Sequence, residues 1–262
     1  MIELFVRCDD VTDDTPALAA VAGAMHDLAV PCAWACIPSR LTAAAVDRLA
    51  AVPGSSVHQH GWTHQRIGAD GVDTEDELPG YPDRASQRTA IVRGRQAMLE
   101  LVGRRAPHVL DLDTFTPPRH RYTRDTLAIL HELGVKRLSA GVYHDLPSRL
   151  IYAVARPFGV VSLGGRGISA HDRPCTAGVP SLGPVEISVS VNVDLDRRGR
   201  PREVDVDALL AEIESAARRT STVGLMLHHD TYAGRPDRAD ALRRLLDAAA
   251  RRWSIVDLRT LG

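Results

Sequence analysis

Short apolar runs alternate with longer amphipathic segments along most of the chain, and this alternation constrains the fold more than any other feature. The runs have the length of strands, and the segments between them repeat apolar residues with helical period. Strands that alternate with helices predict an α/β fold with a largely parallel sheet. We expect strands at Ile2–Cys8, Ala33–Ile37, Ser56–His60, His108–Asp113, Arg137–Ser139, Val160–Leu163, Val185–Val193, Val223–His228 and Ser254–Leu258. We expect helices at Pro16–Leu28, Ala43–Ala51, Asp83–Leu101, Arg124–Leu133, Asp205–Arg218 and Asp237–Arg252.

The number of strand–helix units indicates one closed or nearly closed barrel. Roughly seven or eight such units fit into the 262 residues, which is the scale of a β/α barrel. No break in composition marks a linker, so we expect a single domain over residues 1–262. Residues 141–184 depart from the pattern because they are rich in Gly and Pro and lack a clear period. They form either an inserted lid or substrate loop, or irregular connections.

Composition excludes several classes of protein. A content of 44% hydrophobic and 25% charged residues is that of a soluble globular protein, and the net charge of −1 offers no attraction to nucleic acid or an anionic membrane. The sequence shows no export signal and no apolar stretch long enough to span a bilayer. Four cysteines in a chain of this length do not make a disulfide scaffold, and Cys32 and Cys36 are expected to be buried thiols. These features predict a cytoplasmic protein, with no signal for an oligomeric state.

The first polar cluster is Arg7-Cys8-Asp9-Asp10, at the end of the first predicted strand. Two carboxylates at the end of an apolar strand are costly unless they bind a cation or hydrogen-bond donors. One of them can face the barrel centre directly, and the other can reach it as the chain turns. Helix capping is the alternative role, but Asp13 and Asp14 already provide it.

The second cluster is Val57-His58-Gln59-His60-Gly61-Trp62-Thr63-His64, after the third predicted strand. His60 and His64 are four residues apart and can converge through a turn. Imidazole nitrogens together with a carboxylate are a common ligand set for zinc and neighbouring metals. We therefore expect Asp10, His60 and His64 to bind one divalent metal ion, with coordination positions left for water and substrate. We expect His58 to support or pack against this site.

Two further clusters follow later strands. Phe115-Thr116-Pro117-Pro118-Arg119-His120-Arg121 is either a rigid loop that presents Arg119 or His120, or a plain proline-rich turn. In Leu225-Met226-Leu227-His228-His229-Asp230, a histidine could donate a proton to a leaving group, and Asp230 could orient it or cap the next helix. Because all four clusters follow strands, they are expected at the C-terminal face of one barrel.

A less specific signal is Asp194 with Asp196, at the end of another predicted strand. Arg197 and Arg198 come directly after these acids and could pair with them in solvent.

The order of these motifs resembles that of the polysaccharide deacetylase family, which is related to the family 4 carbohydrate esterases. An Asp-Asp motif is followed by His-x-x-x-His, by a proline-containing loop and by Leu-x-Leu-His, over roughly residues 4 to 230. The Phe-Thr-Pro-Pro stretch and the lack of an export signal are closer to intracellular relatives. The resemblance implies a distorted (β/α)7-type barrel that binds a single metal ion, usually zinc.

The resemblance also assigns roles to individual residues. Asp9 would be the general base that takes a proton from the water, Asp10, His60 and His64 the metal ligands, and His228 the general acid that protonates the departing amine. The metal and a backbone N–H would hold the tetrahedral oxyanion. Supporting or substrate-contacting roles are predicted for Arg119, Trp62, His58 and His229.

The chain departs from the family pattern at three points. Its arginine follows the prolines, as Arg119, whereas the family's precedes them. Val11 stands after the Asp-Asp pair in place of a glycine, and no close match to the family's Asp-x-x-Asp-Trp motif is present.

Three functions remain open on the sequence. The leading one is a metal-dependent deacetylase that removes an acetyl or other N-acyl group from a sugar or related small molecule. The second is a hydrolase of a cyclic amide or imide that uses the same metal. The third is a metal-retaining binding module without turnover. An aromatic content of 4% favours a small or short substrate over a long stacked glycan.

Overall fold

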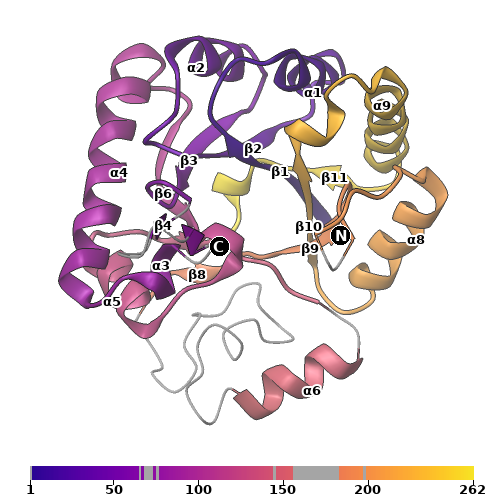
Figure 1. The fold of residues 1–262 in the computed structure, drawn as a ribbon. Coiled ribbons are helices and arrows are strands. Elements are labelled where there is room, and N and C mark those ends of the chain that lie inside the picture. The colour runs from indigo at the N-terminus through magenta and orange to yellow at the C-terminus, as the bar shows by residue number, and fades with distance from the viewer. Residues whose placement is uncertain are drawn as a thin grey trace.

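A curled sheet of parallel strands forms the centre of the molecule, with helices on its outer side (Figure 1). The computed structural model describes residues 2–64, 66–67, 73–74, 77–143, 146–155, 183–196 and 199–262. The order of the strands is β8-β7-β6-β3-β2-β1-β10-β9, and β11 pairs with β1. The strands are β1 (Glu3–Val11), β2 (Cys32–Cys36), β3 (Ser56–His60), β6 (Leu110–Thr116), β7 (Arg137–Leu138), β8 (Val185–Glu186), β9 (Val189–Asn192), β10 (Thr222–His228) and β11 (Ser254–Ile255). A separate antiparallel pair is β4 (Arg66–Ile67) with β5 (Asp73–Thr74).

The two ends of the sheet are joined by one short segment. β8 pairs with β7, and β9, which follows β8 after two residues, pairs with β10. Val189 also forms an isolated bridge with Gly141, just beyond β7. The single-domain α/β barrel predicted from the sequence is therefore confirmed, in a distorted form with short strands on this side.

Local sequence explains where most helices begin. A Thr or Asp side chain accepts the backbone N–H three residues later at the start of α1, α2, α4, α5 and α8. Pro16 occupies the first turn of α1, as predicted. The helices are α1 (Pro16–Asp27), α2 (Ala43–Ala50), α3 (Glu77–Gly80), α4 (Arg84–Arg105), α5 (Arg124–Glu132), α6 (Leu146–Ala155), α8 (Val206–Ala217) and α9 (Pro236–Ala250). Short 3-10 turns are η1 (Pro118–His120), η2 (His229–Tyr232) and η3 (Leu258–Thr260).

The predicted strands have counterparts wherever the structure describes them, but some boundaries were wrong. β6 extends through Thr116, so Phe115 and Thr116 are strand residues rather than part of the proline loop. Phe115 is held there by packing in a buried cluster with Leu138 of the neighbouring strand. The predicted strand Val185–Val193 is interrupted between β8 and β9.

The irregular region at 141–184 is described only in part. Residues 146–155 form α6, a helix that the sequence analysis did not predict. The predicted strand Val160–Leu163 lies outside the described residues, as do residues 144–145 and 156–182 of the suggested lid.

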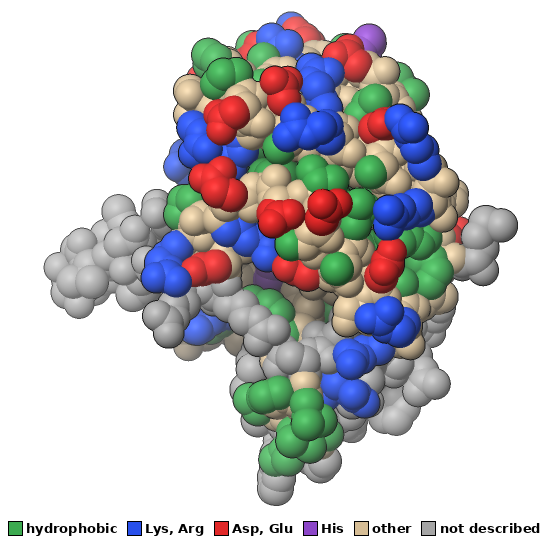
Figure 2. Space-filling view, turned by 90° about the vertical axis from the view of Figure 1, so that its right-hand side faces the viewer, with side chains coloured by type: hydrophobic (Ala, Val, Ile, Leu, Met, Phe, Trp, Pro, Cys, Tyr) green, Lys and Arg blue, Asp and Glu red, His purple; other side chains and the backbone are tan. Residues whose placement is uncertain are grey.

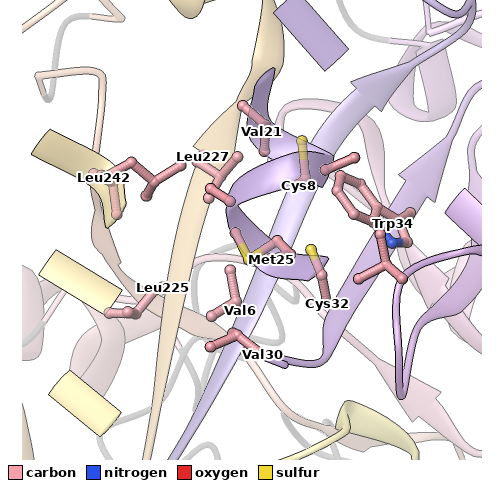
Figure 3. Packing of buried hydrophobic residues seen from close by; sticks show 14 of the residues in the cluster. Val6, Cys8, Val21, Met25, Val30, Cys32, Trp34, Leu225, Leu227 and Leu242 are labelled. Carbon is pink, nitrogen blue, oxygen red and sulfur yellow. The ribbon is translucent and has the colours of Figure 1, made fainter. Parts of the chain in front are cut away.

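Strand β1 lies between the hydrophobic core under the helices and the charged interior of the barrel. Its outward residues, among them Val6 and Cys8, pack with α1 and α9 in the main hydrophobic cluster (Figure 3). The alternate residues include Arg7 and Asp9, which are buried at 0% and 2% exposure. Since side chains alternate across a strand, the apolar face anchors β1 while the other face carries charge into the barrel. Cys8, Cys32 and Cys36 are buried free thiols, as predicted for the latter two.

Charged side chains of both signs are interspersed over the face that carries α8 and α9 (Figure 2). Several form ion pairs, such as Arg235 with Asp237 at 2.8 Å and Arg252 with Glu214 at 3.0 Å. This mixture agrees with a net charge close to zero. Among the described helices, none combines the length and apolar character needed to cross a membrane.

Candidate metal centre

Three of the four polar clusters meet at one end of the barrel. Asp9 of β1 is in direct register with His228 of β10, and His60 of β3 is in register with Thr116 of β6. These positions are the C-terminal ends of parallel strands, where β/α barrels place their chemistry. The proline loop begins directly after Thr116, so the remaining cluster reaches the same rim.

Asp10, His60 and His64 converge on one point. The Asp10 Oδ1 atom is 3.1 Å from His60 Nε2 and 3.1 Å from His64 Nε2. The three potential ligand atoms all lie within 4.8 Å of one another. In a tetrahedral site with metal–ligand bonds of about 2.0–2.1 Å, ligand atoms are separated by about 3.3 Å. These three residues are therefore close enough together to hold one metal ion.

The chemistry of the donor set also fits a cation. His60 Nδ1 is 3.0 Å from the backbone oxygen of Thr116, which can only accept a hydrogen bond, so Nδ1 carries a proton. The Nε2 atom of a neutral His60 then presents its lone pair to Asp10 Oδ1, which is buried and has no hydrogen-bond partner. Two lone pairs that face each other repel, and a proton or a divalent ion between His60 Nε2 and Asp10 Oδ1 would remove this repulsion. Burial opposes a proton on His60, but the hydrogen bond and charge of Asp10 raise the pKa of His60 above its usual value, so protons and a metal ion would compete for the site.

Two of the three candidate ligands have unusual backbone conformations. Asp10 has φ 63° and His64 has φ 65°, both in the left-handed region that residues other than glycine rarely adopt. Such residues cost roughly 1–2 kcal/mol each and persist where the surroundings enforce them. Both unusual conformations therefore occur at residues whose side chains converge on one point.

Asp9 forms a buried, bidentate ion pair with Arg7. Arg7 Nε donates to Asp9 Oδ1 at 2.7 Å, and Nη2 donates to Oδ2 at 2.8 Å. The other side of the guanidinium is held by Ser139, whose backbone oxygen is 2.6 Å from Nη1. Burial opposes ionisation of Asp9, but the charge of Arg7 keeps the pKa of Asp9 well below its usual range. Asp9 is therefore ionised and fixed in orientation.

The proline loop brings His120 to the same ion pair. His120 Nε2 is 2.9 Å from Arg7 Nη2 and 3.8 Å from Asp9 Oδ2. Because arginine can only donate, His120 Nε2 accepts this hydrogen bond. The ring fits because residue 141 is a glycine, and a Cβ there would overlap His120 Nδ1.

Arg119, the arginine predicted to support the site, lies in the same loop with φ 50°. Burial and the charge of His60 lower the pKa of His64 to about 4, and Arg119 contributes in the same direction. The charge of Arg119 thus acts on His64. Its supporting role stays a prediction, and the arginine that holds Asp9 is Arg7.

His228 is paired with Asp194, which corrects one expectation. The sequence left open that Asp194 pairs with Arg197 or Arg198 in solvent, but Asp194 is fully buried and accepts the backbone N–H of His228. His228 Nδ1 is 3.2 Å from Asp194 Oδ1. Burial opposes protonation of His228, but the hydrogen bond and charge of Asp194 raise its pKa to about 9. The adjacent His229 is buried and instead contacts the exposed Asp230, at 3.1 Å.

His58 and Trp62 lie beside the metal ligands. His58 is buried, and its Nε2 is 2.8 Å from the hydroxyl of Thr116, whose backbone oxygen accepts from His60. Burial, aided by the charge of Arg7, lowers the pKa of His58 to about 3, so this imidazole is neutral. The Arg93 guanidinium lies 4.9 Å from the centre of a Trp62 ring. The supporting roles predicted for His58 and Trp62 stay predictions.

Sequence reasoning missed three residues at this site: Arg7, Glu77 and Asp194. The signal for Arg7 was present, since a charged residue stood inside an apolar strand, two positions before Asp9 and on the same face. Asp194 stood at a strand end like the other site residues, but the adjacent arginines suggested a solvent pair. Glu77, which binds the backbone of the His60–His64 turn, carried no signal because it lies in a short helix outside any motif.

Solved structures share this architecture over nearly the whole chain. A candidate polysaccharide deacetylase from Mycobacterium smegmatis superposes with a TM-score of 0.67 at 14% identity, covering 98% of this chain and 88% of that one. The CE4 domain of a multidomain xylanase from the hindgut metagenome of Trinervitermes trinervoides gives 0.56 at 11% identity, with 99% and 88% covered. The chain has the fold of the family 4 carbohydrate esterases.

The same fold includes a protein without activity. A CE4 family pseudoenzyme from Bacillus anthracis superposes with a TM-score of 0.56 at 9% identity, covering 99% of this chain and 64% of that one. No protein-family profile matches the sequence, and no curated protein matches it. Since these likenesses are below 25% identity, they establish the fold, and the chemistry must be argued from the site itself.

Proposed function

We propose that this chain is a metal-dependent deacetylase of the family 4 carbohydrate esterase type, acting on a sugar or related small molecule. The observation that carries the proposal is the placement of an ionised carboxylate, a three-residue metal site and a protonated imidazole on one barrel rim. Amide hydrolysis needs a base for water, a Lewis acid for the carbonyl and an acid for the leaving nitrogen.

The metal would be held by Asp10, His60 and His64. Two imidazole nitrogens and one carboxylate oxygen are a donor set typical of zinc, which we propose as the ion. When bound, a divalent ion of this kind polarises a carbonyl oxygen and lowers the pKa of a water molecule.

Asp9 is the proposed general base. Arg7 keeps it ionised, and an ionised carboxylate retains further lone pairs beyond its two bonds to the guanidinium. Asp9 would accept a proton as water attacks the carbonyl carbon. The rigid pair with Arg7 orients that carboxylate for the transfer without a rearrangement.

His228 is the proposed general acid. With a pKa of about 9 it carries a proton at neutral pH, and Asp194 fixes the ring through Nδ1. Nε2 is then the atom that donates to the leaving nitrogen as the C–N bond breaks. We favour His228 over His229 because the partner of His229 is an exposed carboxylate.

The direct test is acetate release by the zinc-loaded protein from N-acetylated monosaccharides and short oligosaccharides. We expect release by the unchanged protein and its loss in Asp9→Asn, His228→Ala and His60→Ala. Zinc-loaded, folded protein that releases no acetate from any of these substrates would refute the proposal. Turnover of cyclic amides or imides, added to the panel beside these sugars, would instead support the cyclic-amide alternative.

A non-catalytic metal-binding module is the second candidate. It is favoured by one observation, the occurrence of a CE4 family pseudoenzyme with this fold. The presence of both Asp9 and His228 with their buried partners argues against it, since a binding module needs neither ionisation state. Zinc binding without turnover of any substrate in the panel would favour this candidate.

A further inference from the structure

The turn between the two metal-binding histidines has no regular secondary structure to hold it. β3 ends at His60, and the residues up to His64 form bends. Gly61 has φ 63° and His64 has φ 65°, so the chain is in the left-handed region at two of these positions. A turn of this kind needs an external partner to keep its last residue at the metal site.

Glu77 provides that partner. It is the first residue of the short helix α3, and it is 0% exposed. Its Oε1 accepts the backbone N–H of Trp62 at 2.8 Å, and its Oε2 accepts those of Thr63 at 3.2 Å and His64 at 2.7 Å. The two carboxylate oxygens together therefore bind the backbone N–H groups of three consecutive residues of the turn. Hydrogen bonds of backbone N–H groups to a charged acceptor are among the stronger ones in proteins.

The surroundings fit closely around this contact. A Cβ at residue 61 would overlap both Glu77 Oε2 and Pro118 Cγ, so only glycine allows the carboxylate to approach. The hydroxyl of Tyr81 donates to Glu77 Oε1 at 3.3 Å and fixes it from the other side. The carboxylate is thus held by the backbone of the metal-binding turn and by Tyr81, and Gly61 lies between it and Pro118 of the proline loop.

We propose that Glu77 is a positioning residue of the metal centre, which holds His64 in its left-handed conformation so that Nε2 reaches Asp10. It acts through the backbone of residues 62–64 and does not touch the ion. This inference rests on the proposed metal site but not on deacetylation, so it stands or falls by metal binding alone.

Glu77→Gln tests the proposal. The amide keeps one acceptor oxygen but turns an NH2 group toward backbone N–H groups, so part of the turn loses its partner. We expect the Zn²⁺ affinity, measured by competition with a chromophoric chelator, to fall about 10- to 100-fold, as for other residues that orient metal ligands. The absorption spectrum of the Co²⁺-loaded protein should also change, since His64 no longer has a fixed position. Glu100→Gln, an exposed glutamate of α4, is the matched control and should leave both unchanged.

A double-mutant cycle separates positioning from a general loss of stability. In a His64→Ala background, Glu77→Gln should cost no further Zn²⁺ affinity, because the residue through which it acts is gone. An affinity within about twofold of the unchanged protein, or an equal loss in both backgrounds, would overturn the proposal. If Glu77→Gln does not fold, Glu77→Asp offers the same comparison, since it keeps the charge but shortens the reach. If zinc binding depends on Glu77 but the protein turns over no substrate, the deacetylase proposal is refuted and the positioning role of Glu77 stands.

Discussion

Asp9 and His228 are register partners on adjacent strands, yet their surroundings drive them to opposite protonation states. Asp9 faces the guanidinium of Arg7, and its pKa lies well below the usual range. His228 faces the carboxylate of Asp194, and its pKa rises to about 9. Burial disfavours the charged form of both groups, so the two shifts come from the charged partners rather than from burial. Neighbouring groups whose pKa values are pushed apart are the mark of an acid and a base, and this comparison supports the two proposed roles.

Removing the base should have the largest effect. In Asp9→Asn the amide cannot accept a proton, and we expect kcat for acetate release to fall about 100- to 10,000-fold. Zn²⁺ affinity should change little, since Asp9 is not among the predicted ligands. Steady-state kinetics on zinc-quantified protein measures this. A variant that retains most of its activity would show that another group takes the proton.

Removing the partner of the base should affect both stability and activity. Arg7→Met leaves the Asp9 carboxylate buried without a cation, and the loss of one partner of a buried pair costs about 3–5 kcal/mol of unfolding free energy. The pKa of Asp9 should rise as its largest favourable contact is lost, so the acid limb of the pH–rate profile moves to higher pH.

Denaturant unfolding and kcat/KM profiles measure these two effects. Arg244→Met, an exposed arginine of α9, is the control and should be silent in both. An unchanged acid limb in folded Arg7→Met would exclude Asp9 as the titrating base.

Removing the partner of the acid should shift the opposite limb. His228 is active when protonated, so activity is present below its pKa and is lost as the pH rises through about 9. In Asp194→Asn the charge and the charge-assisted hydrogen bond are lost while burial remains, so the pKa falls and activity disappears at lower pH. The alkaline limb of kcat/KM measures this shift. If the alkaline limb stays at the same pH, a group other than His228 causes it.

The smallest effect is expected next to His229. Asp230 is exposed and contacts His229. Asp230→Asn should therefore change kcat, and kcat/KM along the alkaline limb, by no more than about twofold. The comparison with Asp194→Asn therefore decides which histidine is the acid. A larger effect at Asp230 than at Asp194 would reverse the assignment.

The periodicity of the sequence was sufficient to predict the barrel. The helix that starts at Pro16 and the strands that carry Asp9, His60 and His228 followed from local pattern, because a buried parallel strand must be apolar and end at a polar rim. The metal triad followed from residue type and spacing, and the structure brings Asp10, His60 and His64 together. The end of β6 was missed because the predicted strand stops at the charged Asp113, whereas β6 continues to Thr116.

The partners of the functional residues could not be predicted in the same way. Ser139, which holds Arg7, is 132 positions away in sequence, and Asp194 is 34 positions before His228. Such contacts depend on strand order and register, which local pattern does not specify. Glu77 and the positive φ of His64 depend on a turn whose conformation is imposed by tertiary contacts. The cytoplasmic location stays a prediction. The suggested lid within residues 156–182 also stays a prediction.

The central claim is that Asp10, His60 and His64 bind one divalent metal ion. A crystal structure of the zinc-loaded protein, with anomalous data collected on both sides of the zinc absorption edge, tests this directly. We expect a single peak within about 2.0–2.2 Å of Asp10 Oδ1, His60 Nε2 and His64 Nε2. A zinc-loaded crystal with no peak between these atoms, or with zinc held by other residues, would contradict the account.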